Sequence, residues 1–184
     1  RVCSIPVYCH LMGAVYLSWV GLLAYTIRSF CESGAALAVP DMGDAFTRKL
    51  YATYLSYLPV DAFAYPLCTH ADARGSFTEF LRTPERGQVS VNVAKPGVVK
   101  GNHWHHTKNE KFLVVKGQAA IRFRKLGTSE VLEYRVSGDK LEVVDIPTGY
   151  VHNIENVGQG ELVTIMWASE LFDPQNPDTW AEQV

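Results

Sequence analysis

The chain has 184 residues, with 17 Lys and Arg against 19 Asp and Glu and a formal net charge of −2. With 47% hydrophobic and 20% charged residues, its composition is that of one globular domain with a sizeable core. The charge balance excludes a basic nucleic-acid-binding surface, and the composition excludes a collagen-like chain, an acidic disordered tail and a disulfide-dense miniprotein. The cysteines at positions 3, 9, 31 and 68 form no C-x-x-C pair, which predicts reduced thiols in a cytoplasmic protein.

The first 40 residues carry few charges, and the run Leu11–Ile27 carries none. A transmembrane helix needs roughly 20 apolar residues. This run has 17, with two Gly, a Ser and a Thr among them. We therefore expect a helix buried against a partner surface, with a signal peptide or a membrane segment as the alternatives.

Residues 44–58 predict a second helix, which Asp44 caps and Pro59 ends. Its apolar stripe consists of Phe46, Leu50, Tyr54 and Leu58. A connector over 59–72 follows. The chain is therefore expected to have two parts, a helical lead-in at 1–66 and a compact domain at 67–184.

From about residue 75 the pattern changes to short runs of β-branched and aromatic residues separated by turn residues. The predicted strands contain SFTEF, QVSVNV, KFLVV, AAIRFRK, VLEYRV, KLEVVDI and ELVTIMW, in that order. No helical pattern lies between them, so the sequence predicts an all-β sandwich or barrel and not a parallel α/β sheet. The tail from Phe172 is rich in Pro and Asp and is expected to wrap the surface.

Two histidine-containing segments predict a metal site. His103 and His105 are two residues apart, so on a strand both rings point to the same face. Glu110 follows a turn-like segment, and His152 comes later, after a second tight turn. Three imidazoles and one carboxylate suit Zn, Fe, Mn or Ni. The alternative is a surface cluster of histidines, and His106, on the opposite face, is expected to meet substrate or solvent.

The spacing of these residues resembles the two motifs of the cupin superfamily. The first motif is Gly97-x5-His103-x-His105-x4-Glu110-x6-Gly117, and the second is Gly138 followed by Pro147-x-Gly149-x2-His152-x3-Asn156, with a longer gap after its first glycine. The resemblance implies an all-β cupin, a double-stranded β-helix, behind a short α-helical N-terminal segment. It also implies a metal held by His103, His105, Glu110 and His152.

Residues 72–79, DARGSFTE, look like the D-x-R-G-x-F-x-E stretch of the dTDP-4-dehydrorhamnose 3,5-epimerase family, and residues 92–103 resemble a second segment of these enzymes. In this family, arginines matching Arg74 and Lys100 hold the nucleotide diphosphate. The substrate-binding residues implied for this chain are Arg74, Glu79, Asn92 and Lys100.

The family's base falls on His103, which as a metal ligand cannot serve freely in both roles. The remaining titratable candidates are Tyr150, His106, Lys108, Lys111 and Tyr134. Of these, we expect Tyr150 or His106 to transfer the proton. Tyr150 alternates onto the same face as His152 if this segment is a strand.

From about residue 44 onward, long runs such as KGNHWHHTKNEKFLVV are similar to the CapF family of bifunctional capsular polysaccharide enzymes. These enzymes join a reductase to a zinc cupin that epimerises C3 of a UDP-4-keto-6-deoxy-N-acetylhexosamine, leading toward UDP-N-acetyl-L-fucosamine. The resemblance implies a Zn-containing epimerase that takes a UDP-sugar. The sequence lacks G-x-G-x-x-G and Tyr-x-x-x-Lys, so we expect no NADP here and a separate reductase domain as a further partner.

Edge strands of such a barrel expose unpaired backbone groups, so we also expect a homodimer. Two other functions stay open from the sequence. One is a non-catalytic cupin, stabilised by its metal, that binds a sugar nucleotide or mediates dimerisation. The other is a different metal cupin enzyme, such as a dioxygenase or a sugar isomerase. Exchange of the substrate's C3 proton with solvent distinguishes the epimerase from both.

Overall fold

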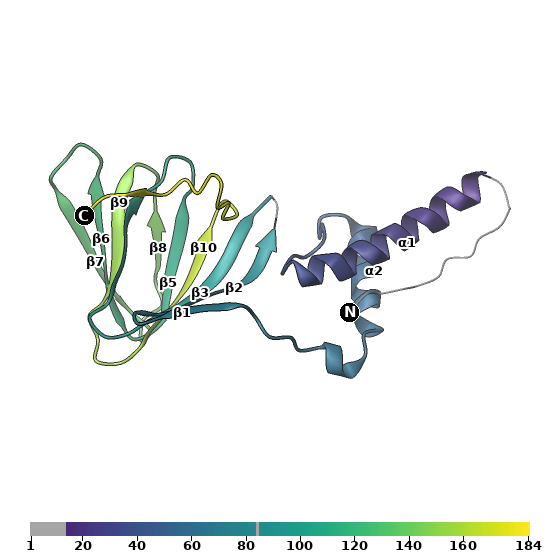
Figure 1. Ribbon diagram of the computed structural model, residues 1–184, viewed down its shortest axis with the longest axis horizontal. Coiled ribbons are helices and arrows are strands. Elements are labelled where there is room, and N and C mark those ends of the chain that lie inside the picture. The colour runs from purple at the N-terminus through teal and green to yellow at the C-terminus, as the bar shows by residue number, and fades with distance from the viewer. Residues whose placement is uncertain (1–13, 84) are drawn as a thin grey trace.

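The computed structural model describes residues 14–83 and 85–184. Cys3, Cys9 and the first residues of the predicted apolar run lie outside the described residues. A helical part and a β-barrel form opposite ends of an elongated molecule and are joined by an extended connector (Figure 1).

The helical part consists of α1 (Ala14–Ala35), α2 (Ala45–Ser56) and the short 3₁₀ helix η1 (Val60–Ala62). Helix α2 begins as predicted, because the Asp44 carboxylate accepts a hydrogen bond from the Thr47 backbone N–H at 2.7 Å. Phe30 of α1 is buried and packs edge-on against Tyr51 of α2, with ring centroids 5.1 Å apart. In the described part of the chain, no helix is long and apolar enough to cross a membrane.

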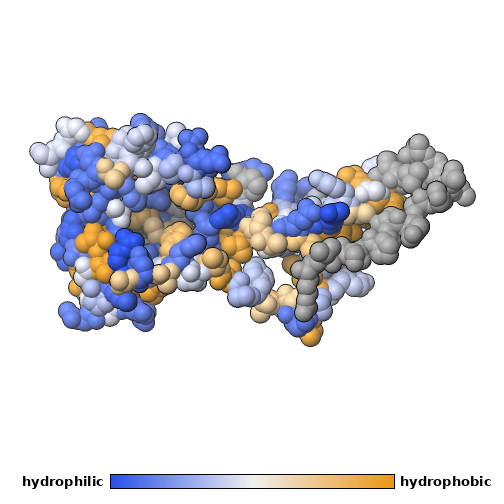
Figure 2. Space-filling view, in the orientation of Figure 1, coloured by the Kyte–Doolittle hydropathy of each residue, from blue (hydrophilic) through white to orange (hydrophobic). Residues whose placement is uncertain are grey.

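The apolar stripe predicted for α2 is not buried by the described residues. None of the side chains of α2 is buried, and Phe46 is 63% exposed. Figure 2 shows apolar residues at the surface of the helical part. The exposed large side chains there include Trp19, Leu22, Tyr25, Tyr57 and Phe63.

The barrel consists of two antiparallel sheets. The strands are β1 (Thr69–Asp72), β2 (Gly75–Thr83), β3 (Gly87–Ala94), β4 (Val99–Trp104), β5 (Glu110–Lys116), β6 (Gln118–Lys125), β7 (Val131–Ser137), β8 (Val143–Ile146), β9 (Tyr150–Asn156), β10 (Leu162–Ala168) and β11 (Trp180–Ala181). One sheet has the order β1-β2-β3-β10-β5-β8, and the other has the order β11-β4-β9-β6-β7.

The core lies between the two sheets. It includes Phe112 of β5, Ile121 and Phe123 of β6, and Leu162 of β10, all with 3% exposure or less. This arrangement confirms the predicted all-β cupin fold with a helical N-terminal segment. Four strands fall outside the predicted runs. Two of them, β4 and β9, carry the histidine motifs, β1 lies in the expected connector, and β11 lies in the C-terminal tail, where it pairs with β4.

Strand β2 contains a bulge that matters for the site. Its pairing with β3 shifts register between Glu79 and Leu81, so Phe80 is an extra residue. An extra residue reverses the alternation of side chains along a strand. Glu79 and Arg82 therefore face the same side and form an ion pair. The backbone N–H of Arg82 also donates to the Leu37 carbonyl at 2.8 Å, which joins the helical part to the barrel.

Candidate functional site

The four predicted metal ligands converge inside the barrel. His103 lies on β4, His105 just after it, Glu110 is the first residue of β5, and His152 lies on β9. His103 and His152 are partners in the β4–β9 pairing. One ligand atom from each of the four side chains lies within 4.8 Å of the others. Segments far apart in the sequence thus bring three imidazoles and one carboxylate together.

A second bulge positions His103. The β4–β9 register shifts between Gly101 and His103, and Asn102 has a positive φ of 57°. At Gly101 the backbone also has a positive φ, 99°, and an added Cβ would lie 2.9 Å from the His152 carbonyl oxygen. A glycine is needed here both for its backbone conformation and for the close approach of β9. The bulge turns Lys100 and His103 toward the same cavity.

The donor atoms fit a divalent transition metal. Glu110 Oε2 lies 3.5 Å from His105 Nε2 and 3.3 Å from His152 Nε2. Donors at tetrahedral Zn–N and Zn–O distances are separated by about 3.3 Å. All three atoms are buried and have no hydrogen-bond partner among the described residues. Buried polar atoms without partners are costly, and a cation at their centre would satisfy them.

The opposite side of two imidazoles is held by backbone carbonyls. His105 Nδ1 lies 2.5 Å from the Asp178 carbonyl oxygen, and His152 Nδ1 lies 3.2 Å from that of Tyr150. A ring that donates its Nδ1–H to a carbonyl leaves Nε2 as a lone-pair donor. Such contacts fix the tautomer and the ring orientation of metal-binding histidines.

The electrostatics of the site favour the protonation states that a metal requires. Burial, helped by the charges of His152 and His105, lowers the pKa of His103 to about 4. Burial by itself would raise the pKa of Glu110, but the imidazoles of His105 and His152 beside its carboxylate bring it to about 2. His103 is therefore neutral and Glu110 ionised near pH 7, as metal ligands must be.

Residues 177–181, here called the C-terminal strap, cross the loop between β4 and β5. The Asp178 carboxylate accepts hydrogen bonds from the backbone N–H groups of His106, Thr107 and Lys108, at 2.9, 2.9 and 3.0 Å. Burial opposes the ionised form, but these N–H groups hold the pKa of Asp178 below its usual range. Lys108 Nζ in turn donates to the Pro177 carbonyl at 2.9 Å. The strap thus holds residues 105–108 of the loop that carries His105.

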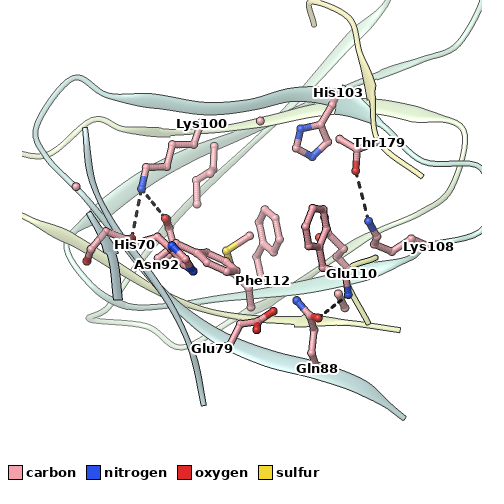
Figure 3. Close-up of a pocket in the computed structure, with 18 of the residues that line it drawn as sticks. His70, Glu79, Gln88, Asn92, Lys100, His103, Lys108, Glu110, Phe112 and Thr179 are labelled. Carbon is pink, nitrogen blue, oxygen red and sulfur yellow. Dashed lines mark hydrogen bonds between the residues drawn. The ribbon is translucent and has the colours of Figure 1, made fainter. Parts of the chain in front are cut away.

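A cavity of about 860 Å³ opens beside the four predicted ligands (Figure 3). The four predicted substrate-binding residues, Arg74, Glu79, Asn92 and Lys100, all line it. This volume is in the range of sites that enclose a small organic ligand. The structure therefore brings both predicted sets of residues to a single cavity.

Lys100 bridges the two sheets across this cavity. Its Nζ donates to Asn92 Oδ1 at 2.7 Å (Figure 3). It also donates to the Val93 carbonyl at 2.9 Å, and both acceptors lie on β3. Burial lowers the pKa of Lys100. The amide nitrogen of Asn92 is buried without a partner among the described residues, so it can donate to a ligand. Arg74 is more accessible, with a side chain 64% exposed and paired with Asp72.

The two residues expected to transfer a proton lie elsewhere. His106 is exposed, and its ring contacts Trp104 and Trp180 at centroid distances of 4.5 and 5.6 Å. Tyr150 shares the face of His152 but lies on the far side of it along β9, where it lines a second cavity of about 310 Å³. Strand alternation identified the correct face for Tyr150, but it cannot say which end of the barrel holds the substrate.

Several lining residues were not predicted, among them His70, Arg82, Gln88 and Thr179. His70 lies on the unpredicted strand β1, and Arg82 reaches the cavity only because of the bulge at Phe80. Thr179 comes from the strap. Runs of Asp and Pro in the tail indicated a surface segment, but no sequence signal indicated its hydrogen bonds to the loop.

Comparison with known proteins agrees with this geometry. The family model of the polysaccharide biosynthesis C-terminal domain matches residues 70–180. UDP-2-acetamido-2,6-beta-L-arabino-hexul-4-ose reductase of Pseudomonas aeruginosa is 46% identical over 162 residues, which make up 88% of this chain and 44% of that protein. The spore coat polysaccharide biosynthesis protein SpsL of Bacillus subtilis is 28% identical over 124 residues, 61% of this chain and 81% of that protein.

Among solved structures, the capsular polysaccharide assembling protein CapF of Staphylococcus aureus is 57% identical, with a TM-score of 0.88. The match covers 90% of this chain and 45% of CapF. CapF with the inhibitor 3-isopropenyl-tropolone matches with a TM-score of 0.87 and covers 90% of this chain and 48% of that one. The chain thus spans just under half the length of CapF and of the P. aeruginosa reductase.

Proposed function

The chain belongs to the polysaccharide biosynthesis C-terminal domain family, and on that premise we propose that it is a nucleotide-sugar C3-epimerase unit. Its substrate would be a UDP-4-keto-6-deoxy-N-acetylhexosamine, in the synthesis of surface polysaccharide by way of UDP-N-acetyl-L-fucosamine. A divalent transition metal, with Zn as the first choice, would be held by His103, His105, Glu110 and His152.

The observation that carries this proposal is that one cavity combines two kinds of group. The four metal-ligand candidates lie at the cavity, and so do Arg74 and Lys100, the two cations expected to meet a diphosphate. A guanidinium and an ammonium recognise phosphate oxygens through charge-assisted hydrogen bonds. Binding at the nucleotide end would supply the energy that holds the sugar in a reactive position.

In this reaction the protein must hold the sugar in position and stabilise the negative charge that develops at the C4 oxygen. The C3 proton of the sugar is acidified by the neighbouring C4 ketone, so a base can remove it, and an acid then returns a proton to the opposite face. The bound cation would supply positive charge that polarises a ligand oxygen. The residues of the chain would orient the hexose, exclude water from it and donate hydrogen bonds, as the unpartnered Asn92 amide nitrogen can.

The proton-transfer group must come within hydrogen-bond reach of the C3 carbon's proton. Tyr150 and His106 meet this condition only if the substrate extends beyond the main cavity. The titratable lining groups outside the metal cluster are His70, Asp72, Arg74, Glu79, Arg82, Lys100, Lys108 and Glu170. His70 is the first of these to test for proton transfer, because it is the imidazole among these groups and imidazole is the most common general base.

A non-catalytic cupin is the second candidate, and it is favoured by one observation. Neither residue expected to move a proton borders the cavity that the described residues form beside the metal cluster. In that case the metal would tie strands together and supply folding energy. The cavity would then bind a sugar nucleotide without converting it.

Proton NMR of the UDP-4-keto sugar in deuterated buffer separates the two candidates. The epimerase exchanges the C3 proton for deuterium, so that signal disappears while the others persist. Arg74→Ala should slow the loss, and Asp173→Ala, at an exposed position in the tail, should leave it unchanged. A static spectrum with saturable binding of the sugar nucleotide would identify the binding module instead.

The partners of this unit follow from the same proposal. Reduction at C4 would belong to a separate reductase domain, against which the exposed apolar side chains of α1 and α2 would pack. Self-association into a homodimer would cover the free edge of a sheet. Light scattering of the purified chain, alone and mixed with a reductase domain, measures both associations.

A further inference from the structure

The C-terminal strap reaches the candidate metal site through two different groups of one residue. The main-chain carbonyl of Asp178 lies 2.5 Å from His105 Nδ1, while its carboxylate accepts three backbone N–H groups from residues 106, 107 and 108. One group therefore orients a ring that is only 3% exposed, and the other fixes the loop that follows this ring.

We propose that Asp178 is a positioning residue for the metal, and that docking of the C-terminal strap and metal binding at His105 are energetically coupled. The proposal rests on the metal site of the proposed function. It adds that the site is complete only when a segment more than seventy residues away in the sequence is in place.

The geometry of His105 supports this coupling. The ring's Nε2 faces Glu110 Oε2 at 3.5 Å, while the opposite nitrogen meets the Asp178 carbonyl. An imidazole has one proton to give when neutral, so a carbonyl at Nδ1 fixes the proton there and leaves Nε2 free to bind a cation. If the strap leaves, the ring can rotate or change tautomer, and the cation loses an oriented donor.

The loop after His105 depends on the strap in the same way. Three consecutive backbone N–H groups point at one carboxylate, and Thr107 Oγ1 adds a fourth bond at 3.2 Å. A carboxylate that accepts several N–H groups makes strong, charge-assisted bonds. Lys108 closes the arrangement, because its Nζ donates to the Pro177 carbonyl and to Thr179 Oγ1. Glu110 begins β5 immediately after this loop, so a second ligand depends on its path.

Coupling between two equilibria is reciprocal. A docked strap should tighten metal binding, and a bound metal should hold the strap in place. The effect of the metal on the strap distinguishes the proposal from a purely structural role. If the strap only stabilised the barrel, bound metal would protect its amides from hydrogen exchange no more than it protects those of the barrel.

Zn²⁺ affinity, measured by competition with a chromophoric chelator, tests the first effect without any sugar nucleotide. Asp178→Ala removes the carboxylate that holds the strap on the loop, so the main-chain carbonyl behind His105 is no longer fixed in place. Zn²⁺ binding should weaken by about 10-fold, the lower end of the range seen when a group behind a metal ligand is lost. Asp173→Ala is the matched control, because Asp173 lies in the same tail and both of its described hydrogen bonds are local, from the Gln175 N–H to its carboxylate and from the Asn176 N–H to its carbonyl. It should bind Zn²⁺ like the unaltered chain.

Amide hydrogen exchange tests the second effect. Zn²⁺ should slow exchange at Thr179 and Trp180 more than at β6, and Asp178→Ala should abolish that difference.

If Asp178→Ala folds poorly, Asp178→Asn replaces it. The asparagine has the same shape, but its NH₂ group faces backbone N–H groups in place of one carboxylate oxygen. This variant should lose less Zn²⁺ affinity than Asp178→Ala. Equal Zn²⁺ affinity in the Asp178 and Asp173 variants would overturn the proposal, and so would a chain that takes up no Zn²⁺. Failure of C3 exchange with normal Zn²⁺ coupling would instead count against the epimerase alone.

Discussion

His103 and His152 stand opposite one another on the paired strands β4 and β9, with ring centroids 4.7 Å apart. Glu110 reaches them from β5, which belongs to the other sheet. A cation at this point would therefore connect the two halves of the barrel. Metal binding should stabilise the fold as well as prepare the site.

Removal of the metal is expected to lower the melting temperature of the chain. At a free metal concentration 1,000 times the dissociation constant, binding to the folded state alone adds about 4 kcal/mol to the free energy of unfolding. His152→Ala should abolish most of this gain, whereas His106→Ala, outside the cluster, should keep it. Melting curves with and without chelator measure the effect. If the unaltered chain melts at the same temperature with and without chelator, the metal does not connect the two sheets.

Gly101→Ala should damage the metal site through the backbone. A Cβ at this position meets the His152 carbonyl at 2.9 Å and requires a positive φ, so β4 and β9 must separate. We expect a loss of roughly 2–3 kcal/mol in stability together with weaker Zn²⁺ binding. Gly97→Ala is the control, because its φ is also positive, at 72°, but nothing lies within 4 Å of the added Cβ. It should cost about 1 kcal/mol and leave Zn²⁺ binding unchanged. Denaturant titration and chelator competition measure the two quantities.

Arg74 and Lys100 should differ in what their removal costs. Arg74→Ala should weaken UDP binding by roughly 10-fold with little change in stability, because its side chain is exposed and its ion pair with Asp72 lies in solvent. Lys100→Met should also cost roughly 1–3 kcal/mol of stability, because Asn92 Oδ1 and the Val93 carbonyl lose a buried donor. Calorimetric titration with UDP and thermal melts give both quantities. Equal stability losses in the two variants would contradict this assignment.

Acidification should destabilise the metal-free protein. The fold lowers the pKa of His103 from 6.5 to about 4 and that of Glu110 from 4.5 to about 2. Below pH 6.5 the unfolded chain therefore takes up a proton at position 103 that the folded chain does not, and below pH 4.5 the same holds at position 110. The free energy of unfolding should fall by at most about 1.4 kcal/mol per pH unit for each such proton.

Melts of the metal-free chain between about pH 8 and about pH 4 measure this slope. His103→Gln removes one of the two groups and should flatten the part of the profile above pH 4.5. If the stability of His103→Gln depends on pH as steeply as that of the unaltered chain, other groups cause the pH dependence.

The sequence was sufficient to predict the barrel and the four convergent side chains, because both depend on local patterns. Alternation over short runs predicts strands, and the spacing of His103, His105, Glu110 and His152 follows a known order. What alternation cannot predict is where it breaks. The bulges at Phe80 and Asn102 reverse the facing of the residues after them. Arg82 was missed for this reason, and Lys100 was found only through family resemblance.

The contribution of the tail depends on contacts between distant segments. Asp178 carries no local signal that distinguishes it from Asp173, yet only Asp178 meets the loop after His105. For Tyr150 the missing information is of another kind. Its face was predicted correctly, but its position along β9 relative to the cavity depends on how the whole barrel closes.

The bond between Arg82 and Leu37 has a practical consequence for the boundary between the two parts. Ala38 also pairs with Arg82 as an isolated parallel bridge. The segment before α2 therefore covers the edge of β2 after Thr78, where β1 no longer pairs with it. A barrel that begins at residue 67 would expose that strand edge next to the exposed ring of Phe80. The unpaired backbone groups of an exposed edge strand can pair with another chain. The barrel expressed without its lead-in should therefore aggregate on storage. A charged residue at position 80 should prevent this.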